Sequence, residues 1–288
     1  MLWTETPLWV QSLVLGVVQG LTEFLPISST AHIDLLKEFM DWTLLSTKSF
    51  DVALHMGTLL ALLAYFQRDL LGLAQAFGRA LRQGARGNPE GRLAFYILLA
   101  TFPAALAGVL WRDTVEEASR SPFFMASMLI LFGLVLAWAD RVARQDRHLQ
   151  GMRWWEAMAV GVAQAVSLFP GVSRSGATMT AAMGLGFGRE DAARFSFLLG
   201  VPIMAGGGLW EARHLLKGSA AAAAYGTGPV SLAGPVLVGV LASAVTGYLC
   251  IHFLLRYLRT GTFLPFVLYR LGLGLVVLVL VLTGAAFR

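Results

Sequence analysis

Two long apolar segments of this chain contain ionisable side chains that could take part in chemistry. Residues 7–32 contain Glu23 and His32, and residues 158–187 contain Arg174, with no other Asp, Glu, His, Lys or Arg in either segment. An ionisable side chain at membrane depth costs several kcal/mol, so such residues usually face a partner or a water-filled cavity. The simplest arrangement places Glu23, His32 and Arg174 around one cavity, with one segment supplying each side.

Each segment is interrupted by a proline beside a cluster of hydroxyl groups. Pro26 and Pro170 each remove a backbone donor and disrupt the preceding helical turn. The hydroxyl groups near the two prolines belong to Ser28, Ser29, Thr30, Ser173, Ser175 and Thr178. A helix that restarts after such a break exposes unpaired backbone N–H groups, which together with the helix dipole favour an anion. Each hydroxyl alone could equally cap a half-helix.

These side chains together indicate a phosphate or pyrophosphate ligand with an apolar tail. The guanidinium of Arg174 presents a planar fork of donors that suits phosphate oxygens. Glu23 and His32, on either side of the first break, would supply an acid and a base. The alternative is a buried ion pair between Glu23 and Arg174 that only holds the two broken helices together. That alternative does not explain why His32 and the hydroxyl groups cluster at the same breaks.

The composition places these segments in a membrane. Of the 288 residues, 57% are hydrophobic and 14% are charged, whereas a soluble domain has about 25% charged residues. The mean hydropathy is +0.67. The net charge of +5 comes from basic residues in short loops between apolar runs, which is typical of membrane proteins and argues against nucleic-acid binding. One cysteine, Cys250, excludes an internal disulfide and a zinc-binding cysteine pattern.

The pattern predicts an all-α integral membrane protein with six transmembrane helices and two broken re-entrant segments. A span needs about 20 helical residues, and backbone groups in lipid must pair within their own helix. The predicted spans are 50–67, 93–111, 122–139, 194–210, 233–254 and 265–287. Residues 8–36 and 154–188 are predicted to be helix–break–helix segments that enter and leave on one side.

Loop charges predict the orientation of the chain. The loops 68–92, 140–153 and 255–264 are rich in arginine, whereas 112–121 and 34–51 carry more acids than bases. The positive-inside rule places the three basic loops in the cytoplasm. Both termini and the opening of the site are then expected on the outer, periplasmic side.

The chain also resembles itself at an offset of 145 residues. Five of the seventeen positions from 16 to 32 match identically at this offset, including Ser28 with Ser173. Each half has one broken segment followed by three predicted spans, and because three is odd the second half must be inverted. The sequence thus predicts an inverted-topology repeat, with repeat one at about 1–145 and repeat two at about 146–288, an architecture typical of transporters.

Both breaks carry recognisable signatures. The sequence QGLTEFLPISSTAH over residues 19–32 resembles the first signature of the undecaprenyl-diphosphate phosphatase family, also called bacitracin-resistance proteins. The sequence PGVSRSGAT over residues 170–178 resembles its second signature. The family pattern has Glu or Gln at the position of Gln19. Glutamine cannot act as an acid, a base or an anionic metal ligand, so Gln19 is expected to support the site and Glu23 to carry the charge.

The resemblance implies a hydrolase of the bacterial inner membrane. It would convert undecaprenyl diphosphate to undecaprenyl phosphate and inorganic phosphate, regenerating the lipid carrier for peptidoglycan synthesis and giving bacitracin resistance. The expected substrate is therefore a lipid diphosphate within the bilayer. A lipid flippase or secondary transporter is the alternative, supported by the inverted repeat.

We expect the following division of roles. The expected catalytic residues are Glu23, His32, Ser29 and Ser28, and the expected diphosphate-binding residues are Arg174, Ser173, Ser175, Gly176, Thr178 and Thr30. A divalent cation, Mg²⁺ or Ca²⁺, would bridge Glu23 and the diphosphate. Either a serine attacks and forms a phosphoserine, or Glu23 and His32 activate a water. Among the serines Ser29 is preferred, because the family signature places it near the histidine.

Two further expectations concern regions outside the site. The glycines at 206–208 and at 272 and 274 could pack helices closely or face a second protomer in a homodimer. The Ala- and Gly-rich stretch 218–232 is expected to be an outer loop with a weak helix.

Overall fold

The structure is a computed structural model that describes residues 6–42, 47–84, 87–217 and 233–284, and these residues form helices without a strand. The helices are α1 (Leu8–Phe24), α2 (Ser29–Met40), α3 (Lys48–Tyr65), α4 (Gln67–Gln83), α5 (Pro89–Leu110), α6 (Arg112–Ser119), α7 (Pro122–Val142), η1 (Leu149–Gly151), α8 (Trp154–Val166), α9 (Arg174–Gly184), α10 (Arg189–Lys217), α12 (Ala233–Tyr257) and α13 (Leu264–Leu282). The all-α membrane fold is confirmed. The stretch 218–232 lies outside the described residues.

Five of the described helices are long and apolar enough to cross a membrane alone, namely α5, α7, α10, α12 and α13. The sixth predicted span, 50–67, falls in α3. This helix reaches the required length and hydropathy only together with α4, from which it is bent by 76°. By length and composition the described residues therefore contain five candidate spans, or six if the bent pair is counted as one span.

Two segments expected to be loops contain helices. Residues 68–92 form α4 and the start of α5, and residues 112–121 contain α6. In α4 the buried side faces α5 at Ala76, while Leu71 and Leu81 on other sides are exposed. Three of the arginines, Arg68, Arg79 and Arg82, belong to α4. Their spacing places them on one face of an amphipathic helix.

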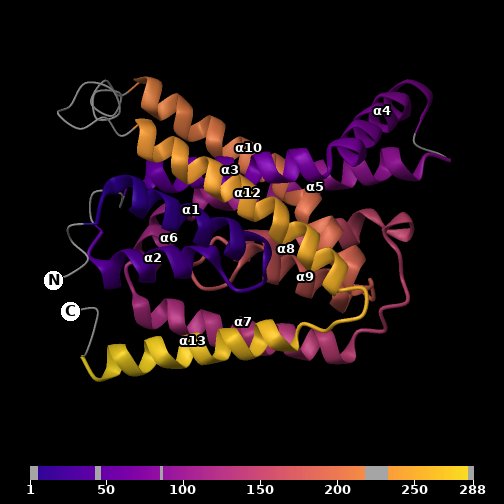
Figure 1. Ribbon diagram of the computed structural model, residues 1–288. Helices are drawn as coiled ribbons and strands as arrows, with labels where there is room; N and C mark the ends of the chain where they lie inside the picture. Colours follow the sequence, from indigo (N-terminus) through magenta and orange to yellow (C-terminus); the bar gives the residue numbers. More distant parts are fainter. Residues whose placement is uncertain (1–5, 43–46, 85–86, 218–232, 285–288) are drawn as a thin grey trace.

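The two helix–break–helix segments are confirmed. The first lies between the end of α1 at Phe24 and the start of α2 at Ser29, and the second between Val166 and Arg174. Both breaks lie within the helix bundle, while α7 and α13 run side by side along one edge (Figure 1). Irregular backbone at this depth is tolerated because surrounding protein groups satisfy its polar atoms.

The halves of the chain use equivalent helix contacts. Helix α12 packs on α1, and α5 packs on α8. A Cβ on Gly16 would lie 2.3 Å from the carbonyl oxygen of Gly239 in α12, and a Cβ on Gly161 would lie 2.4 Å from that of Ala100 in α5. The two glycines are 145 residues apart, so each half brings one backbone close to another at the same repeat position. The residue boundaries of the repeats remain a prediction.

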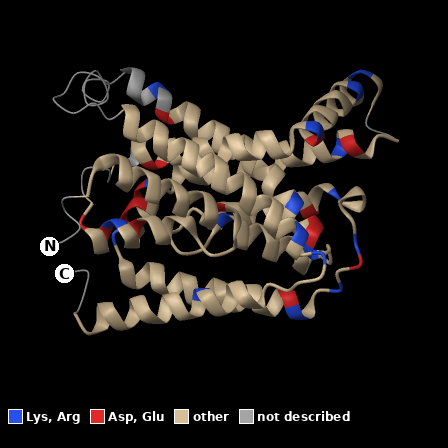
Figure 2. Cartoon of the chain, viewed as in Figure 1, with Lys and Arg blue, Asp and Glu red and all other residues tan. Residues whose placement is uncertain are grey.

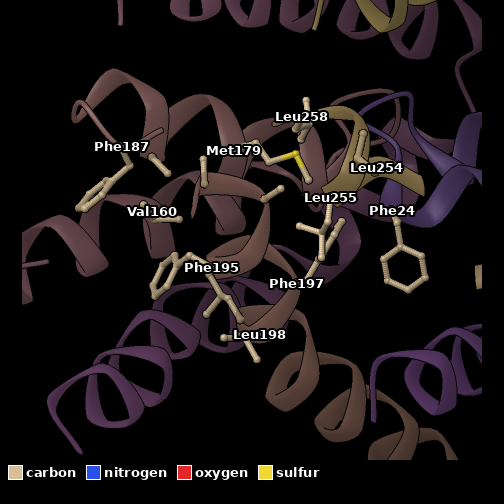
Figure 3. Packing of buried hydrophobic residues seen from close by; sticks show 14 of the residues in the cluster. Phe24, Val160, Met179, Phe187, Phe195, Phe197, Leu198, Leu254, Leu255 and Leu258 are labelled. Atoms are coloured by element: carbon tan, nitrogen blue, oxygen red, sulfur yellow. The ribbon is translucent and has the colours of Figure 1, made fainter. Parts of the chain in front are cut away.

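A hydrophobic core joins helices from both halves (Figure 3). The rings of Phe24 in α1 and Phe197 in α10 meet edge to face, with centroids 5.3 Å apart. Leu254 and Met179 belong to the same buried cluster. Because Phe24 is the last residue of α1, this packing fixes the position of the first break.

Lys and Arg are concentrated over α4 and the adjoining end of the bundle (Figure 2). This is the end that the positive-inside rule assigns to the cytoplasm. The start of α1 and the end of α13 both lie at the opposite end (Figure 1). The orientation of this end relative to the membrane remains a prediction from the loop charges.

Candidate active site

The two breaks meet at a cavity of about 310 Å³. Its polar wall includes Glu23 at the end of α1 and residues at the N-terminal ends of α2 and α9, which are Ser28, Ser29, Thr30, Ser173 and Arg174. Its apolar wall includes Val52, Met56, Leu168, Phe169, Ile203 and Met204. Two half-helix N-termini and a guanidinium thus line one side of a cavity whose other side is apolar, as expected for an anionic group with an apolar tail.

The carboxylate of Glu23 is the centre of the polar wall. Its Oε2 accepts hydrogen bonds from Ser29 Oγ at 2.7 Å and from Gln19 Nε2 at 3.0 Å. His55 Nε2 lies 3.5 Å from the same oxygen. Its Oε1 accepts from the guanidinium of Arg174 at 3.0 Å. Gln19 therefore supports the carboxylate. Glu23 and Arg174 form the ion pair between the two broken segments that the alternative interpretation expected, and both residues also line the cavity.

Arg174 is held by a close approach of α10. A Cβ on Gly200 would lie 2.2 Å from one guanidinium nitrogen of Arg174. The guanidinium also donates to the carbonyl oxygen of Ser196 at 3.5 Å. Glycine at position 200 leaves the space through which the arginine reaches Glu23.

The structure distinguishes the two candidate serine nucleophiles. The hydroxyl of Ser29 donates to Glu23 and lines the cavity. Ser28 also lines the cavity, but its side chain forms no cap hydrogen bond and its carbonyl oxygen accepts from His32 Nδ1 at 2.7 Å. A hydroxyl hydrogen-bonded to a carboxylate is the arrangement expected of an activated nucleophile. The geometry therefore favours Ser29.

Three of the predicted diphosphate-binding residues hold the second break instead of lining the cavity. Ser175 Oγ donates to the carbonyl oxygen of Leu25 at 2.9 Å and so joins the two breaks. Thr178 Oγ1 lies 2.6 Å from Ser196 Oγ. The backbone N–H of Gly176 donates to Ser173 Oγ, which caps α9. Spacing along the chain did not separate these inward-packed positions from Thr30, Ser173 and Arg174, which do line the cavity.

His32 lies away from Glu23 in this structure. Its Nδ1 donates to the carbonyl oxygen of Ser28, so Nε2 accepts from Tyr269 Oη at 2.7 Å. The imidazole stacks on the Tyr269 ring at a centroid distance of 5.5 Å. The expected grouping of Glu23, His32 and Arg174 around one cavity therefore holds for two of the three, and the histidine next to Glu23 is His55.

Two ionisable residues that contact the site were not among the residues predicted from the sequence. His55 lies within the predicted span 50–67, and Arg270 lies within the span 265–287. Arg270 is fully buried and donates to the carbonyl oxygens of Pro26, Gly171 and Val172, so one side chain holds both breaks. Ionisable residues inside regular spans carry the same signal as those at the breaks, and a search of every span would have found both.

The cavity adjoins a second hollow of about 430 Å³, since His55, Val52 and Leu168 line both. The second hollow is also lined by residues at the start of α3, in α6 and towards the end of α10, which are Asp51, Arg112, Val115, Ser119 and Glu211. These segments belong to the end of the bundle that the loop charges place outside.

A divalent cation would have one carboxylate available in the cavity. No group of three or more His, Cys, Asp and Glu side chains suited to a metal ion occurs among the described residues. Magnesium commonly binds through one or two carboxylates together with substrate phosphates. Glu23 therefore fits an ion that is also bound by the diphosphate, and does not fit a metal bound by protein alone.

The fold and the cavity define a multi-pass helical membrane protein with an anion-binding site built from two broken helices. A family model described as "Bacitracin resistance protein BacA" matches residues 12–276. The chain belongs to this family. Two proteins named undecaprenyl-diphosphatase illustrate the similarity. The one from Geotalea daltonii is 46% identical over 276 residues, which are 95% of this chain and 98% of that protein. The one from Moorella thermoacetica is 45% identical over 265 residues, 92% and 95% respectively.

Proposed function

We propose that this protein is an undecaprenyl-diphosphate phosphatase, which hydrolyses undecaprenyl diphosphate to undecaprenyl phosphate and inorganic phosphate. The observation that carries the proposal is the hydrogen bond from Ser29 to Glu23 in a cavity where two half-helix N-termini and Arg174 meet. The names of the similar proteins and the family support the same activity. The activity recycles the lipid carrier of peptidoglycan synthesis and gives bacitracin resistance. The flippase alternative is not favoured, because nothing in these names indicates it.

In the proposed reaction Ser29 is the nucleophile. Its Oγ attacks the terminal phosphorus while Glu23 accepts the hydroxyl proton. The bond between that phosphorus and the bridging oxygen breaks, and its electron pair leaves with undecaprenyl phosphate. Water then attacks the phosphorus of the phosphoserine, and the bond between phosphorus and Oγ breaks. Glu23 returns its proton to Oγ, and inorganic phosphate leaves with the oxygen and protons of the water. The 2.7 Å distance between Ser29 Oγ and Glu23 Oε2 lies within the range for proton transfer to a general base.

Charge on the phosphoryl oxygens would be stabilised by positioned donors. Arg174 presents its guanidinium to the cavity, and the first turn of α2 has backbone N–H groups and no side-chain cap. Such donors supply most of the catalysis in phosphoryl transfer. A divalent ion, Mg²⁺ or Ca²⁺, held by Glu23 and the diphosphate would neutralise further charge. The isoprenoid tail would contact the apolar wall, at about 0.8 kcal/mol per buried CH₂ group.

The proposed role of His32 is to position the backbone of the first break. Because its Nδ1 is bonded to Ser28 and its Nε2 to Tyr269, it holds the residue that precedes Ser29. A direct acid or base role requires the imidazole to leave Tyr269 when substrate binds.

The proposed location is the bacterial inner membrane, with the cavity and both termini on the periplasmic side. Support comes from the basic loops at one end of the bundle and from the second hollow, which lies at the other end. A test starts from a Cys250→Ser background, because Cys250 is the one native cysteine. Ser173→Cys in this background should react with an impermeant thiol reagent added from outside. Reaction from the cytoplasmic side alone would reverse the proposed orientation.

The activity is tested by phosphate release from undecaprenyl diphosphate by the purified protein in detergent. The wild type should release phosphate, while Glu23→Gln, Ser29→Ala and Arg174→Lys should each lose most of the rate. Arg120→Lys is the matched control, because Arg120 lies on the surface with a 77% exposed side chain. Binding of the lipid without phosphate release by folded wild type would favour the flippase.

A further inference from the structure

One of the residues that line the cavity is a buried glutamine whose side-chain amide has no hydrogen-bond partner among the described residues. Gln164 in α8 is 2% exposed and lines the same cavity as Glu23 and Arg174. Within the described part of the chain, neither its Nε2 nor its Oε1 has a hydrogen-bond partner. Buried amide groups are nearly always hydrogen-bonded, because leaving them unpaired costs about 1–3 kcal/mol. An amide that is kept in such a place needs an explanation.

The internal repeat explains why the amide is unpaired. Gln164 lies 145 residues after Gln19, and Gln19 Nε2 donates to Glu23 four residues later at 3.0 Å. Four residues after Gln164 stands Leu168, which is apolar and also lines the cavity. Both halves of the site have a glutamine at the equivalent position, but only the first half has a carboxylate four residues later to bind it. In the second half the amide therefore has no partner in the described protein, at a residue that lines the cavity.

We propose that Gln164 is a substrate-binding residue whose side-chain N–H donates to a phosphoryl oxygen of the diphosphate. This inference rests on the proposed function and adds a residue to it. The guanidinium of Arg174 is shared with Glu23, so a neutral donor on α8 adds a contact that does not compete for the carboxylate. An amide also suits this position better than an acid, since a carboxylate would repel the diphosphate.

The test compares Gln164→Met and Gln164→Glu with wild type in the detergent assay. Gln164→Met keeps about the same volume and removes polarity, and because no protein hydrogen bond is lost the melting temperature should not fall. We expect kcat/KM for undecaprenyl diphosphate to fall about 10- to 100-fold, the effect of losing a hydrogen bond to a charged group. Inhibition by inorganic phosphate should weaken in parallel. Gln164→Glu should be more impaired than Gln164→Met.

Gln11→Met is the matched control. Gln11 is a buried glutamine of α1 outside the cavity, with one hydrogen bond from Nε2 to the carbonyl oxygen of Thr6 at 2.8 Å. Its kcat/KM should stay within about twofold of wild type, whatever its stability.

Two outcomes would overturn the inference. One is a folded Gln164→Met with wild-type kcat/KM and wild-type phosphate inhibition, which would leave the amide without a role in substrate binding. The other is a loss of activity that follows a loss of thermal stability to the same extent in Gln164→Met and Gln11→Met. Neither result touches the proposed function, which fails separately if wild type releases no phosphate.

Discussion

Ser28 and Ser173 adopt the same unusual backbone conformation, with φ of 73° and 74°, although they lie 145 residues apart. Each is the N-cap residue of the half-helix that follows a break. Residues with side chains rarely occupy this region, at a cost of about 1–3 kcal/mol. The packing around each break maintains the conformation, and in both cases it directs a helix N-terminus to the cavity.

This conformation predicts opposite effects for two changes of Ser28. Ser28→Gly relieves the strain and removes no cap hydrogen bond, so it should retain stability and most of the phosphate release. Ser28→Val should lower the melting temperature and activity, because a β-branched residue at positive φ is strongly disfavoured. Loss of activity in a stable Ser28→Gly protein would instead assign a catalytic role to the Ser28 hydroxyl.

The hydrogen bond to Glu23 predicts that Ser29 forms the covalent intermediate. Ser29→Ala should reduce kcat by at least about a thousandfold, as removal of a nucleophile does elsewhere. Acid quenching of the wild-type reaction with labelled diphosphate should trap phosphate on Ser29, detected by mass spectrometry. Ser127→Ala, which changes a serine bonded to its own helix, should behave as wild type. Normal turnover by Ser29→Ala would favour an activated water.

The close approach of α10 predicts that Gly200→Ala impairs catalysis from outside the cavity wall. The added methyl group would displace the guanidinium of Arg174 from Glu23, so kcat/KM should fall about 10-fold or more. Gly206→Ala in the same helix is the control, since a Cβ there meets nothing within 4 Å. Equal activity of the two variants would show that Arg174 relaxes without functional cost.

Arg270 is predicted to be a positioning residue for both breaks. Besides the two breaks, its guanidinium binds the carbonyl oxygen of Leu129 at 3.1 Å. Arg270→Met would leave several buried carbonyl groups unpaired and should destabilise the protein by at least about 3 kcal/mol. Thermal unfolding in detergent measures this, with the exposed Arg256→Met as control. A stable Arg270→Met with normal activity would contradict the role.

The single carboxylate of the cavity predicts a metal requirement that depends on substrate. EDTA should abolish phosphate release, and Mg²⁺ or Ca²⁺ should restore it. Metal binding measured by calorimetry should be weak without a diphosphate and tighter with one, since Glu23 alone is a poor site. Full activity in EDTA would remove the cation from the proposed site.

The glycines at 272 and 274 were expected either to pack helices closely or to face a second protomer, and the structure answers this for one of them. A Cβ on Gly274 would lie 2.7 Å from Ile130, so this position packs α13 on α7 within one chain. A Cβ on Gly272 would meet nothing within 4 Å. The homodimer remains a prediction.

The sequence by itself determined the membrane environment, the two breaks and the chemistry of their residues. A water-soluble fold cannot cover such long uncharged runs with polar surface. Pro26 and Pro170 interrupt their helices whatever those helices pack against. Glu23 and Arg174 could be named because ionisable groups are costly at this depth, and Ser29 was preferred because residues 19–32 resemble a family signature. These are properties of residue type and near neighbours, so no tertiary contact was needed to infer them.

Tertiary structure decided which of these groups meet. Glu23 and Arg174 are 151 residues apart, and His32 is bonded to Tyr269, 237 residues away. Whether a hydroxyl near a break faces the cavity or packs against another helix depends on how helices from the two halves fit together. Side-chain partners within the bundle are chosen by this non-local packing, and the sequence around each break does not contain it.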